Sequence, residues 1–263
     1  MFKANLKHIY GPVHSWRLGV SVGVDPVSSG RKVCNLGCVY CQLGKTRHFI
    51  NERKEFIPTA EVVREILNFP DFTNVDFITF SGRGEPTLAK NLGEMIEATK
   101  KIKPQKVAVI TNSTLLHLED VQRDLSLADV VVAKIDASDE STFQSVNAPC
   151  SGLFLAGIMD GLKAFRKFYK GKLALQIMFI DQNKEEASRI ADVVRGLQAD
   201  EIELNTPLRP SSVRFLAKNE MEEIENCFRG LPVRSVYDRQ RAYVHPLDPI
   251  ATRRRHGVET NVV

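Results

Sequence analysis

Three cysteines, Cys34, Cys38 and Cys41, lie within eight residues of one another in a C-x3-C-x2-C pattern, whereas Cys150 and Cys227 are each isolated by more than seventy residues. Three thiolates on one short loop can hold three corners of a [4Fe–4S] cube, because such clusters are bound through cysteine thiolates. The fourth iron then has no protein ligand and can bind another molecule. The spacing therefore predicts a cluster with one open coordination position.

A zinc site is the alternative for the same three thiols, with His48 as a fourth ligand. Zinc modules usually set their ligands as two separated pairs, and this chain has no second pair. The pattern favours the cluster and leaves zinc as the less favoured interpretation.

A Gly-Glu-Pro turn forms the second group of residues that could do chemistry. It lies in the segment SGRGEPTL, residues 81–88, directly after a strand-like run. A carboxylate such as Glu85 pairs well with an ammonium group, and a glycine such as Gly84 lets a backbone approach a ligand closely. The turn is therefore expected to face a bound ligand.

Apolar runs and helical patterns alternate along the chain, which predicts an α/β fold with a parallel sheet and right-handed crossovers. Asn183 and Glu186 predict a capping box at the start of one helix. Six units are too few for a closed barrel and fit a partial (β/α)6 barrel, with ligands at the carboxyl ends of the strands. The predicted strands are 18–24, 75–80, 106–110, 129–135, 173–179 and 201–204.

With the aromatic Tyr40 just before its last cysteine, the cysteine loop resembles the signature of radical S-adenosylmethionine (SAM) enzymes. In that superfamily a Gly-Gly-Glu-Pro segment contacts the methionine amino group of SAM. Here Arg83 replaces the first glycine, while Gly84 and Glu85 match. Further segments resemble a subgroup related to wyosine (tRNA-imidazoG37) synthetase, and they lie at 10–13, 18–25, 80–88, 134–137 and 205–210.

The resemblance implies a radical SAM core over residues 10–214, followed by a C-terminal helix and basic extension over 215–263. It implies two cofactors, a [4Fe–4S] cluster and SAM, which chelates the open iron. An electron from a donor such as ferredoxin or flavodoxin then cleaves SAM to methionine and a 5′-deoxyadenosyl radical, which removes hydrogen from a substrate. The implied cluster ligands are Cys34, Cys38 and Cys41, and the implied cofactor contacts are Tyr40, Gly84, Glu85, Asn112, Lys134 and Asp136.

The substrate stays open among three classes. The wyosine-related resemblance favours a tRNA base, although the second cluster of wyosine synthetases needs N-terminal cysteines and none precedes Cys34. A glycyl-radical-enzyme activating enzyme, acting on a protein, is the alternative. A non-catalytic protein that binds a metal and RNA is the third.

Charge is concentrated in the last part of the chain. The 263 residues carry a net charge of +4, and from Arg229 onward seven arginines face three acidic residues. Such a tail can contact phosphate or an acidic partner protein, and a solvated end is the alternative. Because a partial barrel leaves a lateral opening for a large partner, the expected substrate contacts are Trp16 and, in the tail, Arg239, Arg241, Arg253, Arg254 and Arg255.

Composition excludes two classes of protein. Hydrophobic residues make up 43% and charged residues 26%, values that fit neither a disordered chain nor a membrane protein. The first fifteen residues contain no apolar segment typical of a signal peptide. The sequence predicts a cytosolic protein with no membrane partner.

Overall fold

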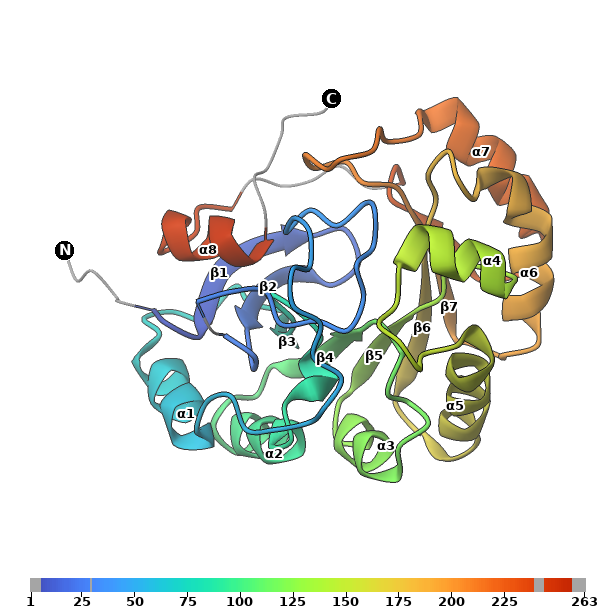
Figure 1. Cartoon of the computed structure of the whole chain (residues 1–263). Helices are drawn as coiled ribbons and strands as arrows, with labels where there is room; N and C mark the ends of the chain where they lie inside the picture. Colours follow the sequence, from blue (N-terminus) through green and yellow to red (C-terminus); the bar gives the residue numbers. More distant parts are fainter. Residues whose placement is uncertain (1–5, 29, 239–243, 257–263) are drawn as a thin grey trace.

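One curved eight-stranded sheet, with its strands in chain order, organises the fold (Figure 1). The computed structural model describes residues 6–28, 30–238 and 244–256. Neighbouring strands from β2 to β8 run parallel, and β1 alone runs antiparallel to β2. The strands are β1 (Ile9–Ser15), β2 (Gly19–Val24), β3 (Phe77–Phe80), β4 (Lys106–Thr111), β5 (Val130–Lys134), β6 (Lys172–Met178), β7 (Glu201–Asn205) and β8 (Val233–Ser235).

Helices cover the convex side of the sheet, and the concave side forms the inside of an open half-barrel (Figure 1). Each connecting helix buries one apolar stripe, as Ile158, Leu162 and Phe165 do in α5. The helices are α1 (Thr59–Asn68), α2 (Leu92–Ile102), α3 (Glu119–Ser126), α4 (Glu140–Thr142), α5 (Leu155–Phe168), α6 (Ala187–Arg195), α7 (Lys218–Cys227) and α8 (Pro249–His256).

The partial-barrel prediction is confirmed, because the six predicted strands correspond to β2 to β7. These strands are covered on both faces and therefore read as continuous apolar runs. The two outer strands escaped prediction. Gly11 and Pro12 interrupt the apolar pattern of β1, which contains an irregularity in its register, and β8 has only three residues.

The capping box predicted at Asn183 is wrong. The Asn183 side chain makes no cap hydrogen bond. Its amide donates instead to the backbone oxygens of Asp136, at 2.8 Å, and Met178, at 3.0 Å. Glu186 accepts from the side chains of Ser138 and Thr142. Both residues therefore fix the loop after β5 rather than the start of a helix.

Helix α8 lies against β1, at the opposite end of the chain (Figure 1). The Gly11 amide donates to Thr252 Oγ1 at 3.0 Å, and the Leu247 amide donates to the Gly11 oxygen at 2.9 Å. Among the described residues, no helix is long and apolar enough to cross a membrane. The domain division at residue 214 stays a prediction.

Candidate active site

The loop between β2 and α1 carries the three cysteines and is attached to the carboxyl ends of two other strands. Val33 pairs with Gly84 after β3, and Leu36 pairs with Pro149 in the segment after β5. Gly37 donates its amide to the oxygens of Asn147 and Ala148 at 3.0 and 2.9 Å. The fold therefore holds the loop by backbone bonds on both sides.

Each of the three thiols accepts a hydrogen bond from a nitrogen outside its own residue. Asn112 Nδ2 lies 3.7 Å from Cys34 Sγ, and Asn147 Nδ2 lies 3.5 Å from Cys38 Sγ. Lys32 Nζ lies 2.9 Å from Cys41 Sγ. Donors of this kind stabilise thiolates that ligate metal, so this donor set fits the predicted cluster.

Burial determines the protonation of the free thiols. It raises the pKa of Cys34 to about 12 and also raises that of Cys38. These side chains are therefore neutral thiols until a metal displaces their protons. Within the described part of the chain, no three His, Cys, Asp or Glu side chains gather closely enough for a single metal ion.

Glu85 is buried and lies at the centre of a hydrogen-bond network at the ends of β3 and β4. Its Oε1 accepts from the Thr87 amide, at 3.0 Å, and from the hydroxyls of Thr87 and Thr111, both at 2.7 Å. Its Oε2 accepts from the Asn112 amide at 2.6 Å. Burial raises the pKa of Glu85, and these donors oppose the rise. The partners recorded for this carboxylate are thus protein groups, and its contact with SAM stays a prediction.

Gly84 is required for a close approach of two backbones. A Cβ atom at this position would lie 1.6 Å from the Val33 oxygen, far inside any permitted contact. In the structure this glycine lets the turn approach the cysteine loop, and its contact with SAM stays a prediction. The neighbouring Glu85 amide donates to the same Val33 oxygen at 2.9 Å.

One polar cluster joins the cysteine loop to the end of β5. It consists of Tyr40, Lys134 and Asp136. Lys134 Nζ lies 3.3 Å from Asp136 Oδ1 and 4.7 Å from the centre of the Tyr40 ring. Asp136 also accepts from the Tyr40 hydroxyl, from Asn147 Nδ2 at 2.7 Å and from the Met178 amide at 2.8 Å. Burial, followed by the Asp136 charge, raises the pKa of Tyr40. Lys134 and Asp136, both predicted as cofactor contacts, therefore form an ion pair with each other, and their contact with SAM stays a prediction.

Two asparagines link these networks to the thiols, and only Asn112 was predicted as a site residue. Asn112 and Asn147 are each followed by a non-glycine residue in left-handed conformation, Ser113 at φ 70° and Ala148 at φ 42°. Such conformations carry strain and cluster at functional sites. Asn147 and Lys32 escaped prediction because no sequence spacing connects them to the cysteines.

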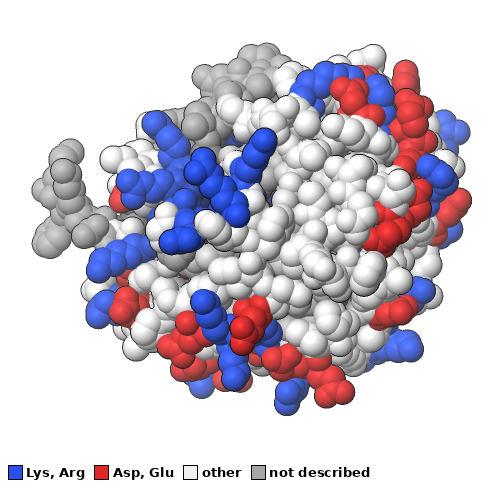
Figure 2. Space-filling view, in the orientation of Figure 1, with Lys and Arg blue, Asp and Glu red and all other residues white. Residues whose placement is uncertain are grey.

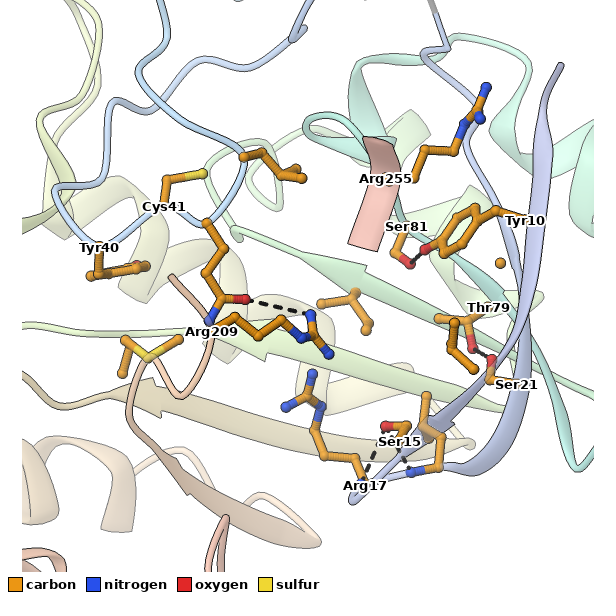
Figure 3. Close-up of a pocket in the computed structure, with 18 residues that line it drawn as sticks. Tyr10, Ser15, Arg17, Ser21, Tyr40, Cys41, Thr79, Ser81, Arg209 and Arg255 are labelled. Atoms are coloured by element: carbon orange, nitrogen blue, oxygen red, sulfur yellow. Dashed lines mark hydrogen bonds between the residues drawn. The ribbon is translucent and has the colours of Figure 1, made fainter. Parts of the chain in front are cut away.

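A cavity of about 230 Å³ lies inside the half-barrel next to the cysteine loop (Figure 3). Met178 of β6 lines it, as do Tyr40 and Cys41. The remaining lining residues are Tyr10, Val13, Ser15, Arg17, Leu18, Ser21, Gly23, Gln42, Leu43, Thr79, Ser81, Gly82, Ile110, Arg209 and Arg255.

The structure places the predicted substrate contacts in different surroundings. Trp16 is buried against Leu208 and Val236 and lines a small cavity beside Arg17, so its contact with substrate stays a prediction. Arg255 is part of the cavity wall and lies 3.2 Å from the buried carboxylate of Asp25. Arg253 and Arg254 are exposed on α8. Arg239 and Arg241 lie outside the described residues.

The comparison with protein families decides what this arrangement is. The model of the radical SAM superfamily matches residues 31–194, which include the cysteine loop and the strands from β3 to β6. The chain belongs to the radical SAM superfamily. It is a radical SAM enzyme, and the superfamily's [4Fe–4S] cluster and SAM are its cofactors, as predicted from the cysteine loop.

Two relatives of this radical SAM protein are named by a family designation alone. UPF0026 protein slr1464 of Synechocystis sp. is 41% identical over 209 residues, which are 78% of this chain and 77% of the relative. UPF0026 protein MJ1312 of Methanocaldococcus jannaschii is 35% identical and aligns over 82% of this chain and 68% of its own. The predicted relation to wyosine synthetases has no support among these names and stays a prediction.

Solved structures support the fold. The SuiB protein of Streptococcus suis, bound to its precursor peptide SuiA, superposes with a TM-score of 0.62 at 16% identity. The match covers 81% of this radical SAM chain and 48% of SuiB, so the chain spans about half of that protein. At this identity the likeness concerns the half-barrel alone.

Proposed function

We propose that this radical SAM enzyme holds its cluster through Cys34, Cys38 and Cys41 and acts on a substrate inside the half-barrel. The observation that carries the proposal is the shared position of loop and cavity, because Cys41 and Tyr40 line the cavity. When bound, the cluster and SAM supply reductive carbon–sulfur cleavage and a carbon radical. A molecule in the cavity would lie beside the loop that carries the proposed cluster ligands.

The protein's own contribution is to position the cofactors and to exclude solvent. Asn112 and Asn147 orient two of the thiols through their amides, and Lys32 orients the third. Glu85, held by four donors, fixes the turn that adjoins the loop. We assign the SAM contacts to Tyr40, Gly84, Glu85, Asn112, Lys134 and Asp136.

Anaerobic reconstitution tests the proposal. The loaded protein should hold about four irons per chain, show iron–sulfur absorption and, with dithionite and SAM, release 5′-deoxyadenosine. Cys41→Ser should lose the cluster and the product. Cys227→Ser, on α7 and outside the loop, is the matched control and should retain both. Tightly bound zinc without iron would contradict the assignment, and a full cluster without 5′-deoxyadenosine would support a non-catalytic protein.

A tRNA base is the second candidate as substrate, because basic side chains gather on the face that carries α8 and the cysteine loop (Figure 2). Exposed basic residues there include Arg31, Lys45 and Arg47 of the loop with Arg253 and Arg254 of α8. If RNA is bound, Arg253→Ala with Arg254→Ala should flatten the dependence of affinity on salt by roughly 0.7–0.9 in slope for each phosphate that the variant no longer neutralises. Salt-independent binding of a protein substrate would favour the activating-enzyme alternative.

A further inference from the structure

We propose that the cavity binds an oxyanion group of the substrate, a phosphate or a carboxylate, between the guanidinium groups of Arg17 and Arg209. The proposal rests on the proposed function and adds the chemical class of the substrate. Both arginines line the cavity of about 230 Å³ and a smaller neighbouring one of about 60 Å³, and Arg17 also lines a larger cavity of about 840 Å³. Figure 3 shows their guanidinium groups pointing toward one another inside the cavity.

Distant segments of the chain bring these cations together. Arg17 lies in the turn between β1 and β2, and Arg209 lies in the segment after β7. The curvature of the sheet brings the two segments to the same cavity. Two like charges that face each other in a partly enclosed space repel, and an anion between them removes the repulsion. Guanidinium groups also bind carboxylate and phosphate with two parallel hydrogen bonds.

The described side chains that line the cavity carry an excess of positive charge. The lining contains three arginines and no acidic residue among the described residues. Asp25 offsets Arg255 in a buried pair at 3.2 Å. Glu203, which lies outside this lining, forms an ion pair with Arg17 at 3.6 Å, and burial raises the pKa of its carboxyl to about 7. Arg209 donates to the neutral Gln42 oxygen at 3.4 Å.

The hydrogen bond between Arg209 and Gln42 connects the proposed oxyanion site to the cysteine loop. Gln42 follows Cys41 directly in sequence, so Arg209 is joined to the loop that holds the cluster. A substrate anchored by Arg17 and Arg209 would extend toward Cys41 and Tyr40 along the cavity wall. A cavity of about 230 Å³ is smaller than ordinary ligand pockets of roughly 300–1,000 Å³, so it suits a small molecule.

Binding of simple oxyanions to the loaded full-length protein tests the proposal. Inorganic phosphate and acetate are titrated separately by calorimetry, with saturating SAM, against the parent, Arg17→Gln, Arg209→Gln and the exposed control Arg195→Gln. We expect one site, and we expect each cavity variant to weaken binding by about ten- to a hundredfold, the range for the removal of charged hydrogen bonds. The control should bind as the parent does.

The two probes distinguish the sources of the oxyanion. Tighter phosphate binding assigns a phosphorylated substrate, and tighter acetate binding assigns a carboxylate. Absence of binding at millimolar concentration, or equal weakening in Arg195→Gln, overturns the proposal. Phosphate or acetate that binds only without SAM also overturns it, because the site would then hold the carboxylate of SAM.

Further measurements distinguish three explanations for a loss of oxyanion binding. These are a misfolded variant, failure of the proposed function and failure of the oxyanion proposal. Arg209→Lys keeps the charge and should recover part of the affinity, which a merely misfolded variant cannot do. Iron content shows whether each variant folds, and the exposed control Arg195→Gln should match the parent both in iron content and in substrate-independent cleavage of SAM. The parent could make no 5′-deoxyadenosine while both cavity variants still weaken phosphate binding. That result would refute the proposed enzymatic function but support the oxyanion site.

Discussion

The cysteine loop and the arginine-lined cavity share Cys41, but their polar groups are organised in different ways. Around the loop, carboxylates meet protein donors, as Glu85 and Asp136 do with four groups each. In the cavity, cations face one another without an acidic residue in the described lining. The loop is therefore preorganised before any cofactor arrives, whereas the cavity presents two converging guanidinium groups to a ligand.

The largest expected effect tests the preorganisation of the loop. Gly84→Ala places a methyl group against the Val33 oxygen, so the segment and the loop must separate. We expect loss of iron incorporation and a destabilisation of several kcal/mol, comparable to severe overpacking. Gly157→Ala in α5, with open space around it, is the control and should stabilise the protein by up to about 1 kcal/mol. Normal iron content in Gly84→Ala would contradict this account of the loop.

Glu203 tests the electrostatics of the cavity through pH. Its pKa is about 7 in the folded protein and near 4.5 when unfolded, so between these values the folded state keeps a proton that the unfolded chain releases. Stability should therefore fall by roughly 3 kcal/mol as pH rises from about 4.5 to about 7 and then level off. Urea unfolding across this range measures it. Glu203→Gln should remove the fall, whereas exposed Glu185→Gln should not; equal slopes in parent and Glu203→Gln would refute it.

A smaller effect is expected at Asn147, which connects Cys38 to Asp136. Asn147→Ala removes donors at 2.7 Å from Asp136 and 3.5 Å from Cys38 Sγ. Leaving a buried carboxylate short of a donor should cost about 1–3 kcal/mol in unfolding free energy. Loss of an N–H to the sulfur should also make the reduction potential of the cluster more negative. Asn226→Ala, exposed on α7, should change neither quantity, and an unchanged potential in Asn147→Ala would remove this asparagine from the site.

The smallest effect concerns backbone strain beside the loop. Ala148→Gly relieves a left-handed alanine but gives the unfolded chain more freedom, so the two effects partly cancel. We expect a gain of at most about 1 kcal/mol by urea unfolding. Ala98→Gly, inside α2, should lose about 1 kcal/mol instead. A loss of similar size in both variants would mean that the alanine is not strained.

Sequence patterns predicted those parts of the molecule whose signals are local. The strands from β2 to β7 follow apolar runs, and the three thiols follow one spacing within a single loop. Lys134 stood out because a lysine in an apolar strand needs a partner, and it has Asp136. Asn147, Lys32 and Arg17 gave no such signal, because each reaches the site only through the crossovers that bring distant segments together.

The position of Arg255 in the cavity wall has a consequence for biosynthesis. The cysteine loop and both asparagines that orient its thiols lie within the first 147 residues, whereas the cavity needs Arg209 and Arg255. Because chains fold from the N-terminus as they leave the ribosome, the thiols can assemble well before the cavity wall is complete. An iron–sulfur donor could therefore reach the loop during translation, before α8 docks on β1.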